Sequence, residues 1–264
     1  MRAFIHRKLD ILRTPLSGLT AGQSCFVKVL LLNLEHLVSV EYPDNLALAA
    51  DPLIIALNHN CSFETILVPA FLIYMRQGRP FSTVSDWMFG RLPVTGWIFR
   101  QLDPVYVYNK PAALSFLNKQ RLRTPAGSII AECINRLSRG QSMMIFPEGT
   151  RNKNPFSLLK GRPGIGHIAL GSQRPVLPIG IDFPARRKTG RIPHLGSLII
   201  RIGKPMTFEQ EVKELHRLQL DAKPGRSALK KVNCLASQIT YDVMLEIAGL
   251  SGKTYPYPRP CLNQ

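Results

Sequence analysis

The sequence predicts an α/β fold: a single mixed, mostly parallel sheet covered by helices, with an N-terminal amphipathic helix. Short apolar runs alternate with segments of helical periodicity from residue 53 to about residue 203, as in a sheet covered on both faces. The chain has 264 residues, 45% of them apolar, which is enough to bury a core without disulfide or metal staples. Its 21 prolines argue against a coiled coil or a long helical repeat.

The expected strands are short runs of apolar or β-branched residues. Residues 53–57 are apolar throughout and lead into a polar turn at residues 58–60. The other expected strands are residues 81–84, 104–108, 142–146, 175–181 and 197–202. Buried strands of a covered sheet read as continuous apolar runs, so these segments form the predicted sheet.

The expected helices lie between and after these strands. Residues 126–138 give the clearest pattern, because apolar residues recur at helical spacing and Gly140 lies just past the end. The other expected helices are residues 65–75, 86–100 (broken near its middle by Gly and Pro), 164–170, 207–220 and 227–250. Residues 255–260, Tyr-Pro-Tyr-Pro-Arg-Pro, are expected to form an extended tail.

Residues 25–40 form the most apolar early stretch. Its longest unbroken apolar run is residues 29–32, whereas a membrane-spanning helix needs about 20 mostly apolar residues. The stretch fits a core helix or an amphipathic helix on a bilayer surface equally well. Residues 1–10 lack the apolar region of a secretory signal. We expect three parts: an N-terminal segment at 1–50, an α/β core at 51–205, and C-terminal helices and a tail at 206–264.

The chain is strongly basic, with 34 Lys and Arg against 17 Asp and Glu and a net charge of +17. The excess lies in two blocks of +8 each, residues 110–162 and residues 183–231. Such an excess favours an anionic partner: nucleic acid, an anionic membrane surface or an acidic carrier protein. We expect no nucleic acid, because the sequence has no zinc finger, no aromatic RNA-binding motif and no helix with a continuous basic stripe.

The five cysteines are scattered and odd in number. None forms a Cys-x-x-Cys pair, and no Cys/His cluster has zinc spacing, so no metal is expected. This usage favours reduced thiols in a cytosolic compartment.

The first segment with candidate chemistry is residues 58–64, Asn-His-Asn-Cys-Ser-Phe-Glu, after an expected strand. His59 in the turn is a candidate general base, and Glu64 in the first turn of the next helix can fold back to orient it. Alternatively, His59 caps a turn and Glu64 is a solvated acid at a helix start. We expect Ser62 to cap the helix, because no nucleophile elbow surrounds it, and Cys61 to be an apolar filler.

The second segment is residues 146–151, Phe-Pro-Glu-Gly-Thr-Arg, again after an expected strand. Gly149 lets backbone amides approach a ligand, Thr150 offers a hydroxyl, and Arg151 offers a planar fork suited to phosphate. Basic residues follow closely at Lys153, Lys160 and Arg162. The arrangement suits an oxyanion or phosphate site. The alternative is an ordinary surface loop that carries basic side chains.

Together the two segments resemble the glycerolipid acyltransferase family, which includes the lysophosphatidate acyltransferases. That family has Asn-His, four residues and then Asp in its first block, and residues 146–151 match its later block in full. Residues 96–100 resemble its middle block, Lys160 and the following glycine resemble its Lys-Gly, and residues 174–179 resemble its closing strand. The resemblance covers about residues 50–205 and implies the family's α/β fold.

The resemblance implies transfer of a fatty acyl group from acyl-CoA or acyl carrier protein to the free hydroxyl of a lysophospholipid such as lysophosphatidate. His59 is then the base and Glu64 its orienting acid. The residues implied in substrate binding are Glu148, Gly149, Thr150, Arg151, Lys160 and Arg100. An acyl thioester is already activated, so no permanently bound cofactor is implied. The expected location is the cytoplasmic face of a membrane, as a peripheral or monotopic protein on an anionic surface.

The sequence departs from the family pattern twice. The first-block acid is Glu64 instead of Asp, and Asn109, followed by Lys110, stands where the family usually has an arginine. These departures leave two alternatives open. One is the same chemistry with another acceptor, such as a lyso-amino-acid lipid, another alcohol or an amine. The other is a catalytically weakened homologue that binds lipid or membrane.

Overall fold

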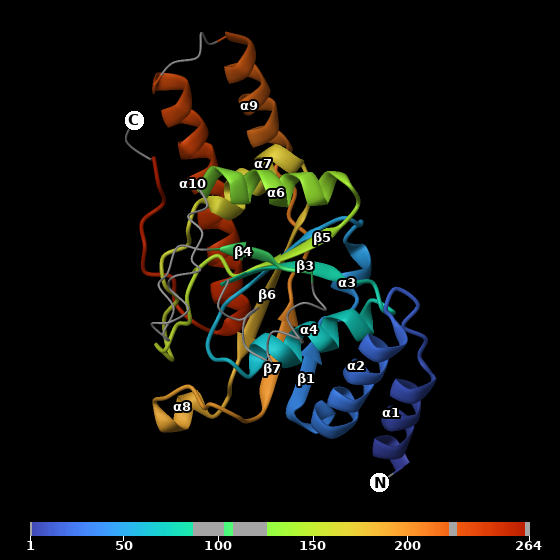
Figure 1. Ribbon diagram of the computed structural model, residues 1–264. Coiled ribbons are helices and arrows are strands. Elements are labelled where there is room, and N and C mark those ends of the chain that lie inside the picture. The colour runs from blue at the N-terminus through green and yellow to red at the C-terminus, as the bar shows by residue number, and fades with distance from the viewer. Residues whose placement is uncertain (1, 87–102, 108–125, 222–225, 262–264) are drawn as a thin grey trace, which may run out of the picture.

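The computed structural model describes residues 2–86, 103–107, 126–221 and 226–261. One seven-stranded sheet runs through this part of the chain in the order β1-β7-β6-β2-β5-β3-β4 (Figure 1). The strands are β1 Val38–Glu41, β2 Ile54–Leu57, β3 Phe81–Asp86, β4 Val105–Val107, β5 Ser142–Ile145, β6 Val176–Asp182 and β7 Leu198–Ile202. All neighbours pair in parallel except β6 and β7. The predicted mixed, mostly parallel sheet is therefore confirmed.

Helices cover both faces of the sheet (Figure 1). One face carries α1 Arg2–Arg13, α2 Ala21–Leu34 and α4 Glu64–Met75, and the other carries α6 Ala126–Ser138, α7 Gly164–Ser172 and α10 Arg226–Ser251. Successive side chains of a strand point to opposite faces. Ile55 and Leu57 of β2 accordingly join the first core, and Ile54 and Ala56 join the second. Central strands buried on both faces explain the continuous apolar runs.

The remaining elements complete the description. They are the 3-10 turn η1 Glu35–Leu37 and the helices α3 Asn45–Leu48, α8 Arg186–Thr189 and α9 Glu209–Asp221. Neither α3 nor α8 was predicted, because a single turn is too short to show periodicity. Most of the helix predicted at residues 86–100 lies outside the described residues.

The apolar stretch at residues 25–40 differs from the prediction of one helix. Helix α2 begins after Thr20, whose side chain forms a capping box with Gln23, and ends at Leu34. The chain then enters β1, which pairs in parallel with β7. Val27 and Leu31 of α2 are buried, so one side of this helix packs in the core. Within the described residues, no helix has both the length and the apolar character to cross a membrane.

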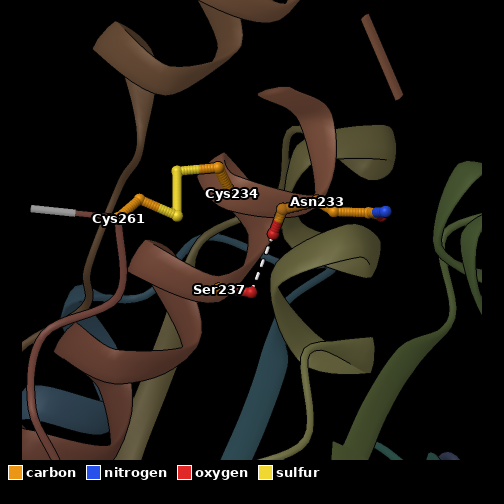
Figure 2. The surroundings of a disulfide bond; sticks show 4 residues. All are labelled: Asn233, Cys234, Ser237 and Cys261. Atoms are coloured by element: carbon orange, nitrogen blue, oxygen red, sulfur yellow. Dashed lines mark hydrogen bonds between the residues drawn. A yellow bond between two sulfur atoms is a disulfide. The ribbon is translucent and has the colours of Figure 1, made fainter. Parts of the chain in front are cut away.

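The expectation of five reduced cysteines is wrong for one pair. Cys234 of α10 forms a disulfide with Cys261, with their Cα atoms 6.1 Å apart (Figure 2). The pair escaped prediction because it is formed by tertiary folding, when the tail turns back along α10. Arg259 of the tail also pairs with Asp242 of α10, at 3.0 Å. The predicted extended tail thus lies on the protein, fixed at its far end.

Candidate active site at the carboxyl ends of the central strands

The two candidate motifs meet at one edge of the sheet. Strand β2 lies between β5 and β6 and runs parallel to both. The motif containing His59 follows β2, and residues 146–151 follow β5. Parallel strands place their carboxyl ends at the same edge, which is where open α/β sheets bind ligands.

His59 and Glu64 form the pair that the sequence predicts. His59 Nδ1 lies 3.0 Å from Glu64 Oε1, since Glu64 begins α4 and its side chain folds back onto the turn. The His59 side chain is 16% exposed, whereas that of Glu64 is fully buried. The imidazole stacks on Phe146, with ring centroids 4.3 Å apart. Within the described part of the chain Nε2 makes no hydrogen bond, so this nitrogen can meet a substrate.

The Glu64 carboxylate is surrounded by donors. Oε1 accepts from the backbone N–H groups of Asn60 and Cys61, the latter at 3.2 Å, and Oε2 accepts from Asn60 Nδ2 at 2.9 Å. An ionised carboxylate only accepts hydrogen bonds, so His59 must carry its proton on Nδ1. This tautomer leaves the lone pair on Nε2. The alternative of a solvated acid at the helix start is wrong, because Glu64 is buried.

Asn58 and Asn60 flank His59, and sequence analysis assigned them no role. Both are buried, with 0% and 4% of their surface exposed. Asn58 Oδ1 accepts from Ile181 N at 2.7 Å and Asn58 Nδ2 donates to Ile181 O at 2.9 Å, which ties the turn to β6. A polar residue directly after a fully apolar strand is the signal that would have identified Asn58 as a structural clamp.

The loop after β5 holds the backbone of His59 from the other side. Glu148 is buried, and its carboxylate accepts from His59 N at 3.1 Å and from Leu159 N at 2.8 Å. Burial raises the pKa of Glu148, and these two N–H donors oppose that rise. The N–H of Asn152 donates to His59 O at 2.7 Å. Glu148 therefore joins the two motifs.

Gly149 and Arg151 occupy the exposed side of this loop. Gly149 has a φ of +65°, which favours glycine, and a Cβ there would stand 2.6 Å from Arg162 Nε, so the arginine side chain would have to move. Arg151 is exposed, and its Nη1 donates to Ser62 Oγ at 2.7 Å. The expectation that Ser62 caps α4 is wrong: the cap residue is Phe63, without a side-chain bond, and the Glu64 carboxylate takes the preceding N–H groups.

The remaining predicted residues are partly placed. Thr150 is half-buried between Gly149 and Arg151, and Lys160 is exposed directly after Leu159. Arg100 lies outside the described residues, as do Asn109 and Lys110. The exposed side chains of Arg151, Lys153, Lys160 and Arg162 give the loop after β5 a positive charge. Among the described residues, no group of three or more His, Cys, Asp and Glu side chains has the arrangement to hold a metal ion.

Cys61 is confirmed as an apolar filler. It is 7% exposed and belongs to the core cluster under α4. Burial, followed by the charge of Glu64, raises the pKa of its thiol. A thiol with a raised pKa is a poor nucleophile.

Comparison with known proteins agrees with the resemblance in the motifs. A model of the acyltransferase family matches residues 37–182, which is more than half of the chain. Among solved structures, the chain is similar to the 1-acyl-sn-glycerophosphate (LPA) acyltransferase PlsC from Thermotoga maritima, with 17% identity and a TM-score of 0.49 over 94% of this chain and 86% of that one. No curated protein matches significantly. The matched segment contains both motifs and six of the seven strands of the sheet, and on this ground the chain belongs to the acyltransferase family.

Proposed function

We propose that this acyltransferase moves a fatty acyl group from an acyl thioester, acyl-CoA or acyl carrier protein, to the free hydroxyl of a lysophospholipid such as lysophosphatidate. His59 is the general base, and Glu64 holds its tautomer and stabilises the imidazolium. The observation that carries the proposal is the 3.0 Å contact between His59 Nδ1 and the buried carboxylate of Glu64.

The proposed reaction needs no covalent enzyme intermediate. Nε2 of His59 takes the proton of the acceptor hydroxyl while the hydroxyl oxygen bonds to the thioester carbonyl carbon. The resulting oxyanion collapses, the carbon–sulfur bond breaks, and the proton on His59 passes to the departing thiolate. The products are the acylated lipid and the free thiol.

We propose that the acceptor phosphate binds at the positive loop after β5, through Arg151 with help from Lys160. The bond from Arg151 to Ser62 supports this assignment, because it brings the guanidinium beside the turn that carries His59. Gly149 and Thr150 would line the pocket for the glycerol, and the buried Glu148 would fix the shape of that pocket by holding the loop in place. Arg100 is proposed as a further acceptor contact on the family resemblance alone.

The decisive experiment incubates the purified protein with mixed acyl thioesters and a lysophospholipid extract, followed by mass spectrometry of the products. We expect a diacylated phospholipid from the wild type and none above background from His59→Ala. Near-normal activity in His59→Ala, with a native melting temperature, would remove the base assignment. Acylation of an amine or a non-lipid alcohol instead would replace the acceptor.

A second experiment tests the phosphate site. Arg151→Ala should raise KM for a phosphorylated acceptor about tenfold more than for an uncharged one, since it removes a charge-assisted contact. Lys204→Ala is the control, because it removes an exposed cation after β7, which is antiparallel to β6 and so ends at the opposite edge of the sheet from both motifs. Equal effects of Arg151→Ala on both acceptors would refute its phosphate role.

We also propose that the protein acts at the cytoplasmic face of a membrane as a peripheral or monotopic protein. Exposed apolar side chains at Leu9, Leu12 and Val29 of α1 and α2, together with the net charge of +17, support contact with anionic lipid. Sedimentation with anionic vesicles should weaken as salt rises, because salt screens the attraction. Equal binding to neutral vesicles would refute the electrostatic part. An acidic acyl carrier protein is a further candidate partner for the same charge.

A further inference from the structure

One buried cation lies behind the His59–Glu64 pair. Lys253 lies two residues after the end of α10 at Ser251 and is 6% exposed. Its Nζ donates to Asn60 Oδ1 at 2.7 Å and to the backbone oxygen of Asn154 at 2.9 Å. Lys253 and Asn60 are 193 residues apart in the sequence. The C-terminal part of the chain thus reaches the turn that carries His59.

The shorter of two contacts that fix which way the Asn60 amide faces comes from Lys253; Asn58 Nδ2 also donates to Asn60 Oδ1, at 3.3 Å. An ammonium group has three donors and no acceptor, so Asn60 must turn its oxygen toward Lys253. The amide nitrogen then faces Glu64, and Nδ2 donates to Oε2 at 2.9 Å. Continuous hydrogen bonds therefore run from Lys253 through Asn60 and Glu64 to His59 Nδ1. In this series the Asn60 amide has its oxygen toward Lys253 and its nitrogen toward Glu64, and the opposite orientation would face donor to donor and acceptor to acceptor.

The charges around Lys253 show that it is not an ordinary surface ion. Glu148 after β5, Glu64 of α4 and Asp182 of β6 attract its charge, and Arg186 of α8 repels it. Burial is the largest influence and lowers the pKa of Lys253 to about 8. Among the described residues, no carboxylate forms a direct ion pair with Nζ. An amide oxygen and a carbonyl are the partners instead.

The backbone around Lys253 is held firmly. Thr254 N donates to Phe156 O at 2.8 Å, and Leu158 N donates to Thr254 O at 2.9 Å. These bonds pin the chain after α10 to the loop that follows the second motif. Lys253 therefore meets Asn60 from a fixed position, as a residue that orients its neighbours must.

We propose that Lys253 is a positioning residue of the acyl-transfer site: its ammonium group orients Asn60, and through Asn60 it fixes the Glu64 carboxylate and the Nδ1–H tautomer of His59. The inference rests on the proposed function in taking His59 as the base. It assigns a role in the site to a residue 71 positions beyond the matched family segment, which ends at residue 182.

The kinetic test compares variants of the full-length protein. Lys253→Met should lower kcat about 10- to 100-fold, as a small misplacement of a catalytic group does, with KM for the thioester within about threefold of wild type. Asn60→Ala should have a similar effect, and the double variant should be no worse than the poorer single one, because both act through Glu64. Lys204→Met, an exposed lysine after β7, is the matched control and should behave as wild type. Lys253→Met within twofold of wild type, or fully additive losses, would overturn the proposal.

The pH profile separates orientation by the ammonium from packing by the side chain. Wild-type kcat should fall on the alkaline side with an apparent pKa near 8, the value for Lys253. Lys253→Arg keeps the charge throughout this range, so it should retain activity above that of Lys253→Met and lose the alkaline fall. An unchanged alkaline fall in Lys253→Arg would refute the role of the ammonium. If Lys253→Met fails to fold, Lys253→Arg and Asn60→Ala still test whether Lys253 positions the site.

A measurement without substrate keeps this inference distinct from the proposed function. In protein labelled with ¹⁵N-histidine, the neutral wild-type His59 ring should show a protonated Nδ1 and an unprotonated Nε2 in long-range ¹H–¹⁵N spectra. Lys253→Met should shift it toward a mixture of tautomers, and Lys204→Met should not. If no lysophospholipid is acylated, the proposed acceptor fails while the spectra still test Lys253. A wild-type-like His59 spectrum in Lys253→Met would overturn the positioning role.

Discussion

Replacing Glu64 by glutamine removes the charge beside His59 and keeps the shape of the side chain. Three donors converge on Oε1, namely His59 Nδ1 and the N–H groups of Asn60 and Cys61, and only Asn60 Nδ2 meets Oε2. The glutamine oxygen should therefore take the place of Oε1. Its NH₂ group then faces Asn60 Nδ2, donor against donor. The substitution therefore removes the charge and also breaks the contact with Asn60 Nδ2, so the loss expected from the charge alone is a lower limit.

The expected loss follows from the 3.0 Å contact between His59 Nδ1 and Glu64 Oε1. That contact places the charges of a carboxylate and an imidazolium about 4 Å apart, where their attraction is about 4 kcal/mol at an effective dielectric constant near 20. A neutral hydrogen bond retains about 1 kcal/mol of this. About 3 kcal/mol of transition-state stabilisation is lost, which lowers kcat about 100-fold.

The assay is steady-state release of the free thiol from an acyl thioester, with a lysophospholipid acceptor at saturation. Glu64→Gln should also unfold at a lower urea concentration, because the buried donor–donor contact costs about 1–3 kcal/mol. The control is Lys204→Met, an exposed lysine after β7, which should leave kcat unchanged. A kcat within threefold of wild type for Glu64→Gln would refute the charge-stabilised base.

Three further predictions concern the same acid, the charge cluster at the end of β6, and the tail. Glu64→Asp should lower kcat about 100-fold, because the shorter side chain withdraws the carboxylate from its donors; higher activity would mean that glutamate is a handicap. Asp182→Asn should cost about 3 kcal/mol of unfolding free energy at pH 7, since the buried carboxylate accepts from three arginines. Burial would raise the pKa of Asp182, but these arginines hold it below its usual 3.8. The contribution of Asp182 to the free energy of unfolding is therefore present above pH 4 and is lost as pH falls through the lowered pKa. Urea unfolding should show a smaller difference in stability between Asp182→Asn and wild type at pH 3 than at pH 7. Cys234→Ser should cost about 2–4 kcal/mol by freeing the tail, and reductant should lower wild-type stability equally; no change in either would exclude a stabilising disulfide.

The sheet was predictable where its strands are buried on both faces. All four residues of β2 and of β5 are buried and, apart from Ser142, they are apolar, so both runs point to strands without any knowledge of their partners. Strand β1 was missed, because Val38 and Val40 continue the apolar character of the preceding helix. Only the pairing with β7, about 160 residues later in the chain, makes this segment a strand. Tertiary partners decided its conformation, and a local pattern cannot show them.

The His59–Glu64 pair was predictable for a local reason. A turn after a buried strand and an acid at the start of the next helix lie within reach of each other whatever surrounds them. The bonds from Glu148 to both motifs and from Lys253 to Asn60 join separate segments, so neither follows from spacing. Lys253 also lies in a stretch with no motif, where a single lysine in a basic chain gives no signal.

The contacts around Glu64 suggest how the site accommodates glutamate in place of the family's usual aspartate. The extra methylene places the carboxylate beneath the turn, where it meets the N–H groups of Asn60 and Cys61 as well as His59. A longer side chain has more rotamers to restrict, and it orients His59 only if both of its oxygens are held. Asn60 Nδ2 holds the second oxygen, and Lys253 holds Asn60. On this reasoning the glutamate and the buried lysine function together, and shortening Glu64 to aspartate should make activity less sensitive to the loss of Lys253, since the contact that Lys253 supports is then already broken.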